Sequence, residues 1–385
     1  MDYVNEPDTA LYSPSVASPM ASPVGTKRRK PAFHEFFAGS GLVSHALAPY
    51  FDVVWANDIS AKKAAVYTAN HAPGKFQLGS ITDVYGGMLP SATLSWASFP
   101  CQDLSLAGQT AGIDAERSGL VWQWLRIIDE AIEPPPLLVA ENVVGLVSVK
   151  GGAHYRALHE KLRQRGYAVG ALMLDAVRWV PQSRPRIFVV AFHQDFPIPA
   201  ELTAAGPTWA HPAAVVNAAQ GISDWVWWRL PEPEPRKKDL ADIIEWDAPC
   251  DPPEIAARNI ALIPDHHRRM LDALDTFAAP GYKRTRANGQ TLELRFDGVA
   301  GCLRTPKGGS SRQFLVLKRN GTLSTRLLTV RETARLMGAP DSFQLPGTYN
   351  DGYMAMGDAV AAPVAAYLAK HLLSPLAKAL HRDDS

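Results

Sequence analysis

The sequence predicts an α/β fold with a doubly wound, mostly parallel sheet and a smaller, irregular second domain. Between residue 31 and about residue 195, short apolar segments alternate with segments of helical spacing. This alternation is typical of parallel strands joined by crossover helices. From about residue 196 it gives way to proline clusters and a basic stretch. The 385 residues suffice for one large or two modest domains.

The first strand is predicted at residues 31–37, from its apolar and aromatic content. A glycine turn at residues 38–41 and a helix at residues 42–48 follow, which is an arrangement that lets backbone approach a nucleotide cofactor. A second strand at residues 51–56 ends next to Asp58, at the distance expected for an acid that binds a ribose hydroxyl. Because the third glycine of the dinucleotide fingerprint is missing, the pattern favours an adenosine cofactor without a pyrophosphate.

The remaining elements continue the alternation up to residue 192. A last helix then returns beside the first strand. We expect helices at residues 62–70, 118–132, 155–165 and 360–373, and strands at residues 75–78, 93–98, 137–140, 167–174 and 187–192.

Cys101 lies just past the predicted strand at residues 93–98, in the segment Ser98-Phe-Pro-Cys-Gln-Asp-Leu-Ser105. On its own, a cysteine at such a position is more often a buried structural residue than a nucleophile. However, the glycine turn, Asp58 and Glu141 also follow predicted strands, and ligands of open α/β sheets bind at this edge. Beside a thiol and a cofactor turn, Glu141 has the properties of a general acid.

The composition excludes several classes of protein. Cys101, Cys250 and Cys302 are the three cysteines, and no C-x-x-C is present, which argues against a disulfide framework or a zinc ribbon and suits a reducing compartment. No His/Cys cluster has metal-ligand spacing, and His266-His267 is interpreted as a solvated helix end, so no metal is expected. We find no apolar run that is long enough to span a membrane and no apolar signal-peptide core.

Residues 1–30 are predicted to form a disordered tail with a basic end. Residues 1–26 are rich in Pro, Ser and Ala and offer little apolar surface to bury. Lys27-Arg-Arg-Lys30 closes the tail. The run is interpreted first as a solvated charge cluster, and the alternatives are an arm that steers toward phosphates or an import signal.

Taken together, six motifs in a fixed order resemble the DNA (cytosine-5)-methyltransferase family, in its bacterial form. They span about residues 31–375. The motifs are Phe37-Ala-Gly39-Ser-Gly41, Pro100-Cys101-Gln102 with Ser105, Glu141-Asn142-Val143, Gln182-Ser-Arg184-Pro-Arg186, Arg331-Glu332-Thr-Ala-Arg335-Leu-Met-Gly338 and Gly357-Asp358-Ala359-Val360.

This resemblance implies a Rossmann-like fold that binds S-adenosyl-L-methionine and methylates carbon 5 of cytosine. Cys101 would be the nucleophile that adds to carbon 6 of the base, which needs a thiolate. Glu141 would bind the edge of the base and supply a proton, and Arg184 and Arg186 would support that edge and the thiolate by their charge. The target base must be flipped out of the duplex to react.

The resemblance also implies a set of cofactor-binding residues. Two of them depart from the family pattern. Ser80 stands where an Asp often contacts the adenine amine, and nearby Asp83 is an alternative for this contact. Asp358 replaces the usual Asn. We expect Asp358 to accept hydrogen bonds from the loop backbone near Cys101 or Gln102. The expected cofactor residues are Phe37, Ala38, Gly39, Ser40, Gly41, Leu42, Asp58, Ile59, Ser80, Ile81, Phe99, Pro100, Leu120, Asp358 and Val360.

Residues 196–325 are expected to form the target-recognition domain. Residues 281–335 contain twelve Lys and Arg but three Asp and Glu, a local excess of positive charge that indicates a nucleic-acid interface. The run Trp225-Val-Trp227-Trp228 is predicted to lie in the core of this small domain rather than to stack on bases. The expected DNA contacts are Gln102, Ser105, Arg284, Arg286, Arg304 and Arg312.

The expected organisation is therefore a catalytic domain at residues 31–195, completed by residues 326–385 after the recognition domain. We expect a monomer that binds double-stranded DNA in the cytoplasm, associated with the bacterial nucleoid, and a cognate restriction endonuclease is left open as a partner. Three alternatives remain. They are a tRNA cytosine-5 methyltransferase, whose Cys-Phe-Thr signature is not found, a non-catalytic DNA-binding relative, and an enzyme that transfers a modified methyl group.

Overall fold

The computed structural model describes residues 29–100, 119–286, 289–305 and 312–380 of the chain. The chain divides after Lys30 into two units, and everything below concerns the second unit, which begins at Pro31. The predicted tail, up to residue 28, and the segment that follows Pro100 lie outside the described residues.

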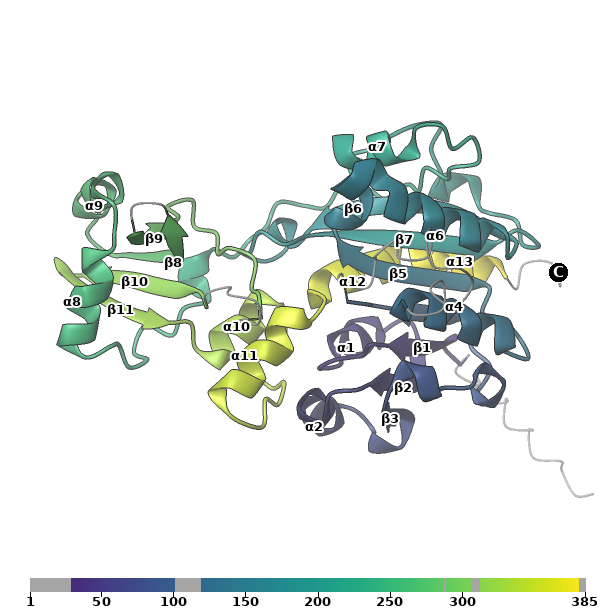
Figure 1. Cartoon of the computed structure of the whole chain (residues 1–385), viewed down its shortest axis with the longest axis horizontal. Coiled ribbons are helices and arrows are strands. Elements are labelled where there is room, and N and C mark those ends of the chain that lie inside the picture. Colours follow the sequence, from purple (N-terminus) through teal and green to yellow (C-terminus); the bar gives the residue numbers. More distant parts are fainter. Residues whose placement is uncertain (1–28, 101–118, 287–288, 306–311, 381–385) are drawn as a thin grey trace, which may run out of the picture. The chain divides into compact units, whose positions relative to one another are not determined.

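The larger sheet has strands at Ala32–Phe36 (β1), Asp52–Asp58 (β2), Phe76–Leu78 (β3), Leu94–Ala97 (β4), Leu137–Val143 (β5), Tyr167–Asp175 (β6) and Pro185–His193 (β7). Their order is β3-β2-β1-β4-β5-β7-β6 (Figure 1). The first five strands pair in parallel, whereas β7 is antiparallel to both β5 and β6. This is the doubly wound, mostly parallel sheet that the sequence predicts.

Helices cover both faces of this sheet, because its strands are apolar on both sides. On β5, Leu137 and Val139 belong to one core cluster, whereas Leu138 and Ala140 belong to another. The first cluster includes side chains from α1 (Leu42–Leu47), α12 (Ala362–Leu368) and α13 (Ser374–Ala379). The second includes side chains from α4 (Leu120–Glu130), α5 (Gly145–Ser148), α6 (Ala153–Arg163) and α7 (Ala213–Ala219).

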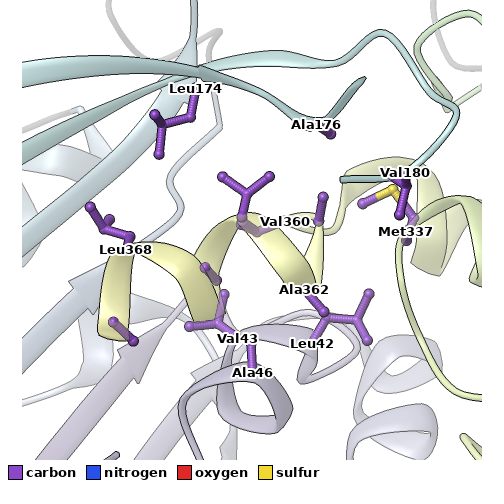
Figure 2. Close-up of a cluster of buried hydrophobic side chains, with 14 of the residues drawn as sticks. Leu42, Val43, Ala46, Leu174, Ala176, Val180, Met337, Val360, Ala362 and Leu368 are labelled. Carbon is purple, nitrogen blue, oxygen red and sulfur yellow. The ribbon is translucent and has the colours of Figure 1, made fainter. Parts of the chain in front are cut away.

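The C-terminal helix α12 packs directly against α1, as expected for a segment that returns to the first strand. Figure 2 shows Val43 and Ala46 of α1 on one side of α12 and Leu174 of β6 on the other. Val360, immediately before the helix, is buried in the same cluster. The two ends of the described chain therefore share one core.

The smaller sheet is antiparallel, with the order β11-β10-β8-β9. One face packs in a separate cluster that includes Ile263, Leu271 and Val316, whereas Leu315 and Leu317 on the other face belong to the first core cluster. The sequence did not reveal these strands, because Pro280 and Gly281 interrupt the alternation inside β8. The strands span Phe277–Arg286 (β8), Gly289–Leu294 (β9), Phe314–Arg319 (β10) and Thr322–Leu327 (β11), and helices α8 (Pro253–Ala261) and α9 (Asp265–Asp272) precede them.

The tryptophan run at residues 225–228 packs on the large sheet, so its predicted place in the core of the small domain was wrong. Trp228 is fully buried, and its indole N–H donates to the Val190 carbonyl of β7 at 3.1 Å. Trp225 packs against Tyr155 of α6, with ring centroids 4.9 Å apart. Residues on either side of the run, among them Leu202 and Ile244, also belong to the first core cluster.

Three further helices complete the described part of the chain: α2 (Ala61–Asn70), α10 (Val330–Leu336) and α11 (Tyr349–Asp358). α10 and α11 each begin with a reciprocal capping box, formed by Thr329 with Glu332 and by Thr348 with Asp351. Glu332 is also paired with Arg326 of β11 at 2.5 Å, and both side chains are buried. This buried ion pair joins the last strand of the small sheet to α10.

Among the described residues, the stretch Tyr349–Ala379 is long and apolar enough to cross a membrane by length and composition alone. The expectation that no such run exists was therefore wrong by that measure. However, 56% of its most apolar window is buried, and Leu368 and Leu372 belong to the protein core. Core helices of globular proteins commonly meet the same criterion, so this single stretch is weak support for a membrane span.

Glu35 is a carboxyl group buried in the centre of β1. Its Oε2 accepts a hydrogen bond from the Ser44 backbone N–H at 3.1 Å and another from the Ser44 hydroxyl, which ties β1 to α1. Burial raises the pKa of Glu35 to about 8, although the hydrogen bonds from Ser44 act in the opposite direction. Glu35 is therefore largely protonated at neutral pH.

We predict that Glu35 makes the protein less stable as the pH rises from about 4.5 to about 8. In this window the folded state keeps a proton that the unfolded chain has released, so the free energy of unfolding falls. Glu35→Gln keeps an acceptor for Ser44 but cannot ionise, and should remove this fall. Urea denaturation of both proteins at several pH values measures it, with the exposed Glu133→Gln as a control. Parallel stability profiles for Glu35→Gln and the parent would contradict the prediction.

Candidate active site

One cavity of about 450 Å³ lies at the carboxyl ends of β1, β2, β4 and β5. Residues that directly follow or end these strands line it, including Phe37, Asp58, Ser98 and Val143. Thr305 and residues 357–360, far away in the sequence, also contribute to the lining. The cavity therefore occupies the edge of the sheet at which ligands of open α/β folds bind.

Both glycines of the turn adopt a backbone conformation that favours glycine. Gly39 and Gly41 have φ values of +55° and +81°, in the left-handed region that favours glycine. A side chain on Gly39 would meet no atom closer than 3.9 Å, so its missing side chain leaves room in the cavity that it lines. On Gly41, a Cβ would instead lie 2.6 Å from His71, so this glycine is required by packing within the protein.

Asp58 is hydrogen-bonded to the backbone of the glycine turn. Its carboxylate accepts a hydrogen bond from the Gly39 N–H at 2.9 Å and another from the Ser60 N–H at 2.8 Å. Asp58 is buried but lines the cavity. Because a carboxylate can accept up to four hydrogen bonds, both oxygens retain acceptor capacity for a ligand hydroxyl.

Nearly all of the expected cofactor residues line this single cavity. Two are exceptions: Ser40 and Gly41 are not among the residues that line it. The Ser40 hydroxyl is buried, and no hydrogen-bond partner for it is found among the described residues. Those that line the cavity are Phe37, Ala38, Gly39, Leu42, Asp58, Ile59, Ser80, Ile81, Phe99, Pro100, Leu120, Asp358 and Val360.

Glu141 lies at the deep side of the cavity and forms an ion pair with Arg186. The Arg186 Nε is 3.3 Å from the Glu141 Oε1, and both side chains are largely buried. Burial raises the pKa of Glu141, and the charges of Arg186 and Arg184 only partly oppose this. β5 continues past Ala140, where the sequence predicted its end, because β7 pairs with it as far as Val143.

The segment that leads to Cys101 is anchored against β5. The Asn142 side chain donates a hydrogen bond to the Phe99 carbonyl at 3.0 Å, and both residues line the cavity together with Pro100. The expected nucleophile Cys101 and the expected DNA contacts Gln102 and Ser105 lie outside the described residues. The chain thus enters this segment from the wall of the cavity, beside Glu141.

Arg184 joins three parts of the chain through the two Nη groups of its guanidinium, whereas no partner for its buried Nε is found among the described residues. Its Nη1 donates to the Leu303 carbonyl at 2.9 Å, and its Nη2 donates to the carbonyls of Gly357 and Ala359 at 3.0 and 2.7 Å. Arg184 is 2% exposed, and burial, with the nearby charge of Arg186, lowers its pKa to about 10. These contacts hold the backbone around the cavity, which is a positioning role that its motif did not reveal.

Cys302 is a site residue that the sequence analysis did not single out. Its Sγ lies 3.4 Å from Arg184 Nη1 and 3.8 Å from Arg186 Nη2. Burial alone would raise the pKa of Cys302, but the positive charges of Arg184 and Arg186 more than offset it, so the pKa is lowered. The sequence around Cys302 has no motif that could have predicted this neighbourhood.

Asp358 has a partner that the sequence analysis did not anticipate. Its Oδ2 lies 2.7 Å from the Nζ of Lys63, in the first turn of α2. The expectation was that Asp358 accepts hydrogen bonds from the loop near Cys101, and that loop lies outside the described residues. Lys63 also lines the cavity, so the replacement of the family's Asn by Asp358 is matched by a positive charge within the same site.

The arginines expected to contact DNA occupy two regions. Arg284 and Arg286, near the end of β8, are both paired with Glu293 of β9 on an exposed surface. Arg304 is exposed and directly precedes Thr305, which lines the cavity. Arg312 instead donates to the Asn350 side chain at 2.5 Å and lies over the Tyr349 ring.

A part of the basic excess in residues 281–335 is neutralised by acids elsewhere in the chain. Arg319 pairs with Asp247, and Arg335 pairs with Asp341. Within the described ranges, no group of three or more His, Cys, Asp or Glu side chains is placed to hold a metal ion.

Comparisons with known proteins give a consistent result. The family model described as C-5 cytosine-specific DNA methylase matches residues 32–374. The Type II methyltransferase M.NlaX of Neisseria lactamica is 26% identical over 349 residues, which cover 89% of this chain and 96% of that protein. M.BsuFI of Bacillus subtilis is 25% identical over 338 residues, with 87% and 70% covered.

Shorter and structural matches agree with this result. M.Bsp6I of Bacillus sp. (strain RFL6) is 31% identical over 179 residues, so the match covers 43% of this chain and only 56% of that methyltransferase. The crystal structure of the S. pombe Dnmt2 methyltransferase superimposes with a TM-score of 0.60 at 19% identity, over 91% of this chain and 100% of its own. At that identity the likeness shows the fold alone. With the family match across most of its length, this chain belongs to the C-5 cytosine-specific DNA methylase family.

Proposed function

We propose that this protein transfers a methyl group from S-adenosyl-L-methionine to carbon 5 of a flipped-out cytosine in a specific sequence of double-stranded DNA. The observation that carries this proposal is the buried pair of Glu141 and Arg186, which lies in one cavity with Pro100 and the glycine turn. That cavity supports two neighbouring sites, one for the cofactor and one for the base.

The cofactor would occupy the part of the cavity lined by the glycine turn. Gly39 leaves open space there, Asp58 retains acceptor capacity for a ribose hydroxyl, and Ile59 offers an exposed apolar side chain against which an adenine ring can pack. S-adenosylmethionine, when bound, supplies an electrophilic methyl group on a sulfonium. Ser80 and Ile81 also line the cavity and would contact the adenine end.

Cys101 would act as the nucleophile, since carbon 5 of cytosine is itself a weak one. The thiolate adds to carbon 6, and the electron pair of the carbon 5–carbon 6 double bond becomes available at carbon 5 to take the methyl group. Removal of the carbon 5 proton by a base then returns the electron pair, and the bond between carbon 6 and the Cys101 sulfur breaks. The thiolate is regenerated, so the protein is unchanged by the cycle.

Glu141 would supply a proton to the ring nitrogen N3 as the thiolate adds, and would take it back when the bond between carbon 6 and the Cys101 sulfur breaks. Its raised pKa suits this role, because burial favours the protonated form of the carboxyl group, which is the form that donates. Arg186, 3.3 Å away, fixes the position of the carboxyl group. Arg184 and Arg186 together add positive charge next to the position where a thiolate is needed.

The recognition of DNA would fall mainly to the small sheet and its flanking segments. Residues 196–325 are the proposed recognition domain, but the tryptophan run at residues 225–228 packs on the large sheet. Asp251 and Thr325 are hydrogen-bonded to each other, so the two ends of the segment between them meet. We therefore place the determinants of sequence within residues 251–325, including Arg284, Arg286 and Arg304, whereas Arg312 is held by α11.

The setting follows from this activity. The protein would work as a monomer in the bacterial cytoplasm, associated with the nucleoid, and the names of its relatives make a cognate restriction endonuclease a candidate partner. Residues 31–195 and 326–385 would form the catalytic domain.

We predict that DNA with 5-fluorocytosine at the target position traps the protein covalently through Cys101. Fluorine cannot leave carbon 5 as a proton does, so elimination of the thiolate stops. A denaturation-resistant complex on a gel measures the adduct. Cys101→Ser should form none, because a hydroxyl is almost never ionised at neutral pH. An equal amount of adduct with Cys101→Ser would exclude this residue as the nucleophile.

We predict that Glu141→Gln lowers the single-turnover rate of methyl transfer by about 100- to 10,000-fold, the usual contribution of a general acid. The amide still donates and accepts hydrogen bonds, so DNA binding should be kept. In the parent the rate should fall as the pH rises through the raised pKa of Glu141, because only the protonated form donates. Glu133→Gln, an exposed carboxyl outside the cavity, is the control. A rate for Glu141→Gln close to that of the parent would leave Glu141 with a structural role only.

We predict that exchanging residues 251–325 with those of a relative that methylates another sequence changes the methylated motif. The graft begins and ends where the chain meets itself at Asp251 and Thr325. Ala300, Leu303 and Thr305 keep the parent's residues, because the first two belong to the first core cluster and the third lines the cavity. Bisulfite sequencing of DNA from cells that express the graft gives the motif, and the same cells with the parent protein are the control. An unchanged motif from an active graft would assign recognition elsewhere.

A further inference from the structure

Two ion pairs join the start of α2 to α11, and only one of them lies in the cavity. Lys63 pairs with Asp358 at 2.7 Å, and both residues belong to the cavity lining. Lys62 pairs with Asp351 at 2.6 Å, and neither of these residues lines the cavity. The pair of Lys62 and Asp351 already joins the two helices outside the cavity. The pair of Lys63 and Asp358 is therefore a candidate for a role in ligand binding.

Lys63 is the cation of the cavity that is least engaged by the protein. Of the other basic residues in the lining, Arg184 donates to three carbonyls and Arg186 is paired with Glu141. Among the described residues, the Lys63 ammonium is hydrogen-bonded to Asp358 alone. An ammonium has three N–H donors, so two of them remain for a ligand.

Among the acids of the cavity, Asp358 likewise has few partners in the described part of the chain. Glu35 is buried and hydrogen-bonded to Ser44, and Asp58 accepts two backbone N–H groups. Asp358 is 42% exposed, and Lys63 is the partner that the described residues provide for it. The pair of Lys63 and Asp358 therefore presents one cation and one anion to the cavity, and both are partly exposed to solvent.

We propose that Lys63 binds the carboxylate, and Asp358 the ammonium, of the amino-acid end of the cofactor. This inference rests on the proposed function, because it takes S-adenosylmethionine as the ligand. The ligand would open the ion pair and form two new pairs with its own opposite charges. A partly exposed pair contributes little to stability, so opening it costs little, and the exchange keeps both charges compensated.

The space beside the pair is large enough for such a group to enter. The Lys63 side chain passes 3.9 Å from the position that a Cβ on Gly39 would take, and nothing else lies closer to that position. Gly39 thus leaves a gap between the glycine turn and the Lys63 chain, inside the cavity. Asp358 also precedes Val360, which is fixed in the core, so its backbone does not need to move.

The test is calorimetric binding of two ligands to the full-length protein: S-adenosylhomocysteine, which carries the amino-acid end, and 5′-methylthioadenosine, which lacks it. Lys63→Gln should weaken the binding of S-adenosylhomocysteine by about five- to tenfold, the range for one partly screened charged contact. The affinity for methylthioadenosine should stay unchanged. Lys62→Gln, the matched control on the same helix, should change neither affinity. Asp358→Asn should change the affinity for S-adenosylhomocysteine less than Lys63→Gln does. The substitution weakens the contact with the ligand's ammonium, but it also frees the Lys63 ammonium from its ion pair.

The outcomes separate this inference from the proposed function. If the parent binds neither ligand, the proposed cofactor is wrong, and the inference falls with it. If the parent binds S-adenosylhomocysteine and Lys63→Gln binds it equally well, or loses both ligands alike, only the role of Lys63 is overturned. A loss confined to S-adenosylhomocysteine, and absent in Lys62→Gln, supports the exchange.

Discussion

The buried guanidinium of Arg184 is the interaction on which the architecture of the site depends. It is hydrogen-bonded to the carbonyls of Leu303, Gly357 and Ala359, which come from two segments more than one hundred residues farther along the chain. A charge at 2% exposure is tolerated only when such partners replace water. Removing any of these segments would leave a buried charge uncompensated, so the cavity wall, the end of α11 and the start of β7 hold their positions together.

This arrangement also sets the electrostatics around Glu141. Arg184 and Arg186 place two positive charges next to a carboxyl group whose pKa burial raises, and the same charges act on the Cys302 thiol. The two effects have opposite signs for Glu141, and burial is the larger one. The same two arginines therefore adjoin a carboxyl group whose pKa is raised and a thiol whose pKa is lowered, because desolvation outweighs their charges at Glu141 but not at Cys302.

The sequence predicted what is encoded locally. The strands of the large sheet, the glycine turn and the positions of Asp58 and Glu141 follow from apolar runs and from residues that end them, and the structure brings these residues to one cavity. It could not predict the pair of Lys63 and Asp358, whose partners are 295 residues apart, or the contact between Arg184 and Gly357, 173 residues apart. Likewise the tryptophan run carries no signal of which sheet it covers, since burial on either would give the same composition.

The return of the chain to α12 has a consequence for how the protein is made. Gly357, Asp358 and Val360 line the cavity, and α12 then fills a gap in the core beside α1. On the ribosome, Gly39 is made more than 300 residues before Gly357. A nascent chain thus holds an unfinished cavity until the later residues have been made, with the α1 face of the sheet uncovered. The wall that residues 357–360 supply, and the α12 side chains that cover α1, reach the site only after the whole smaller sheet has been synthesised.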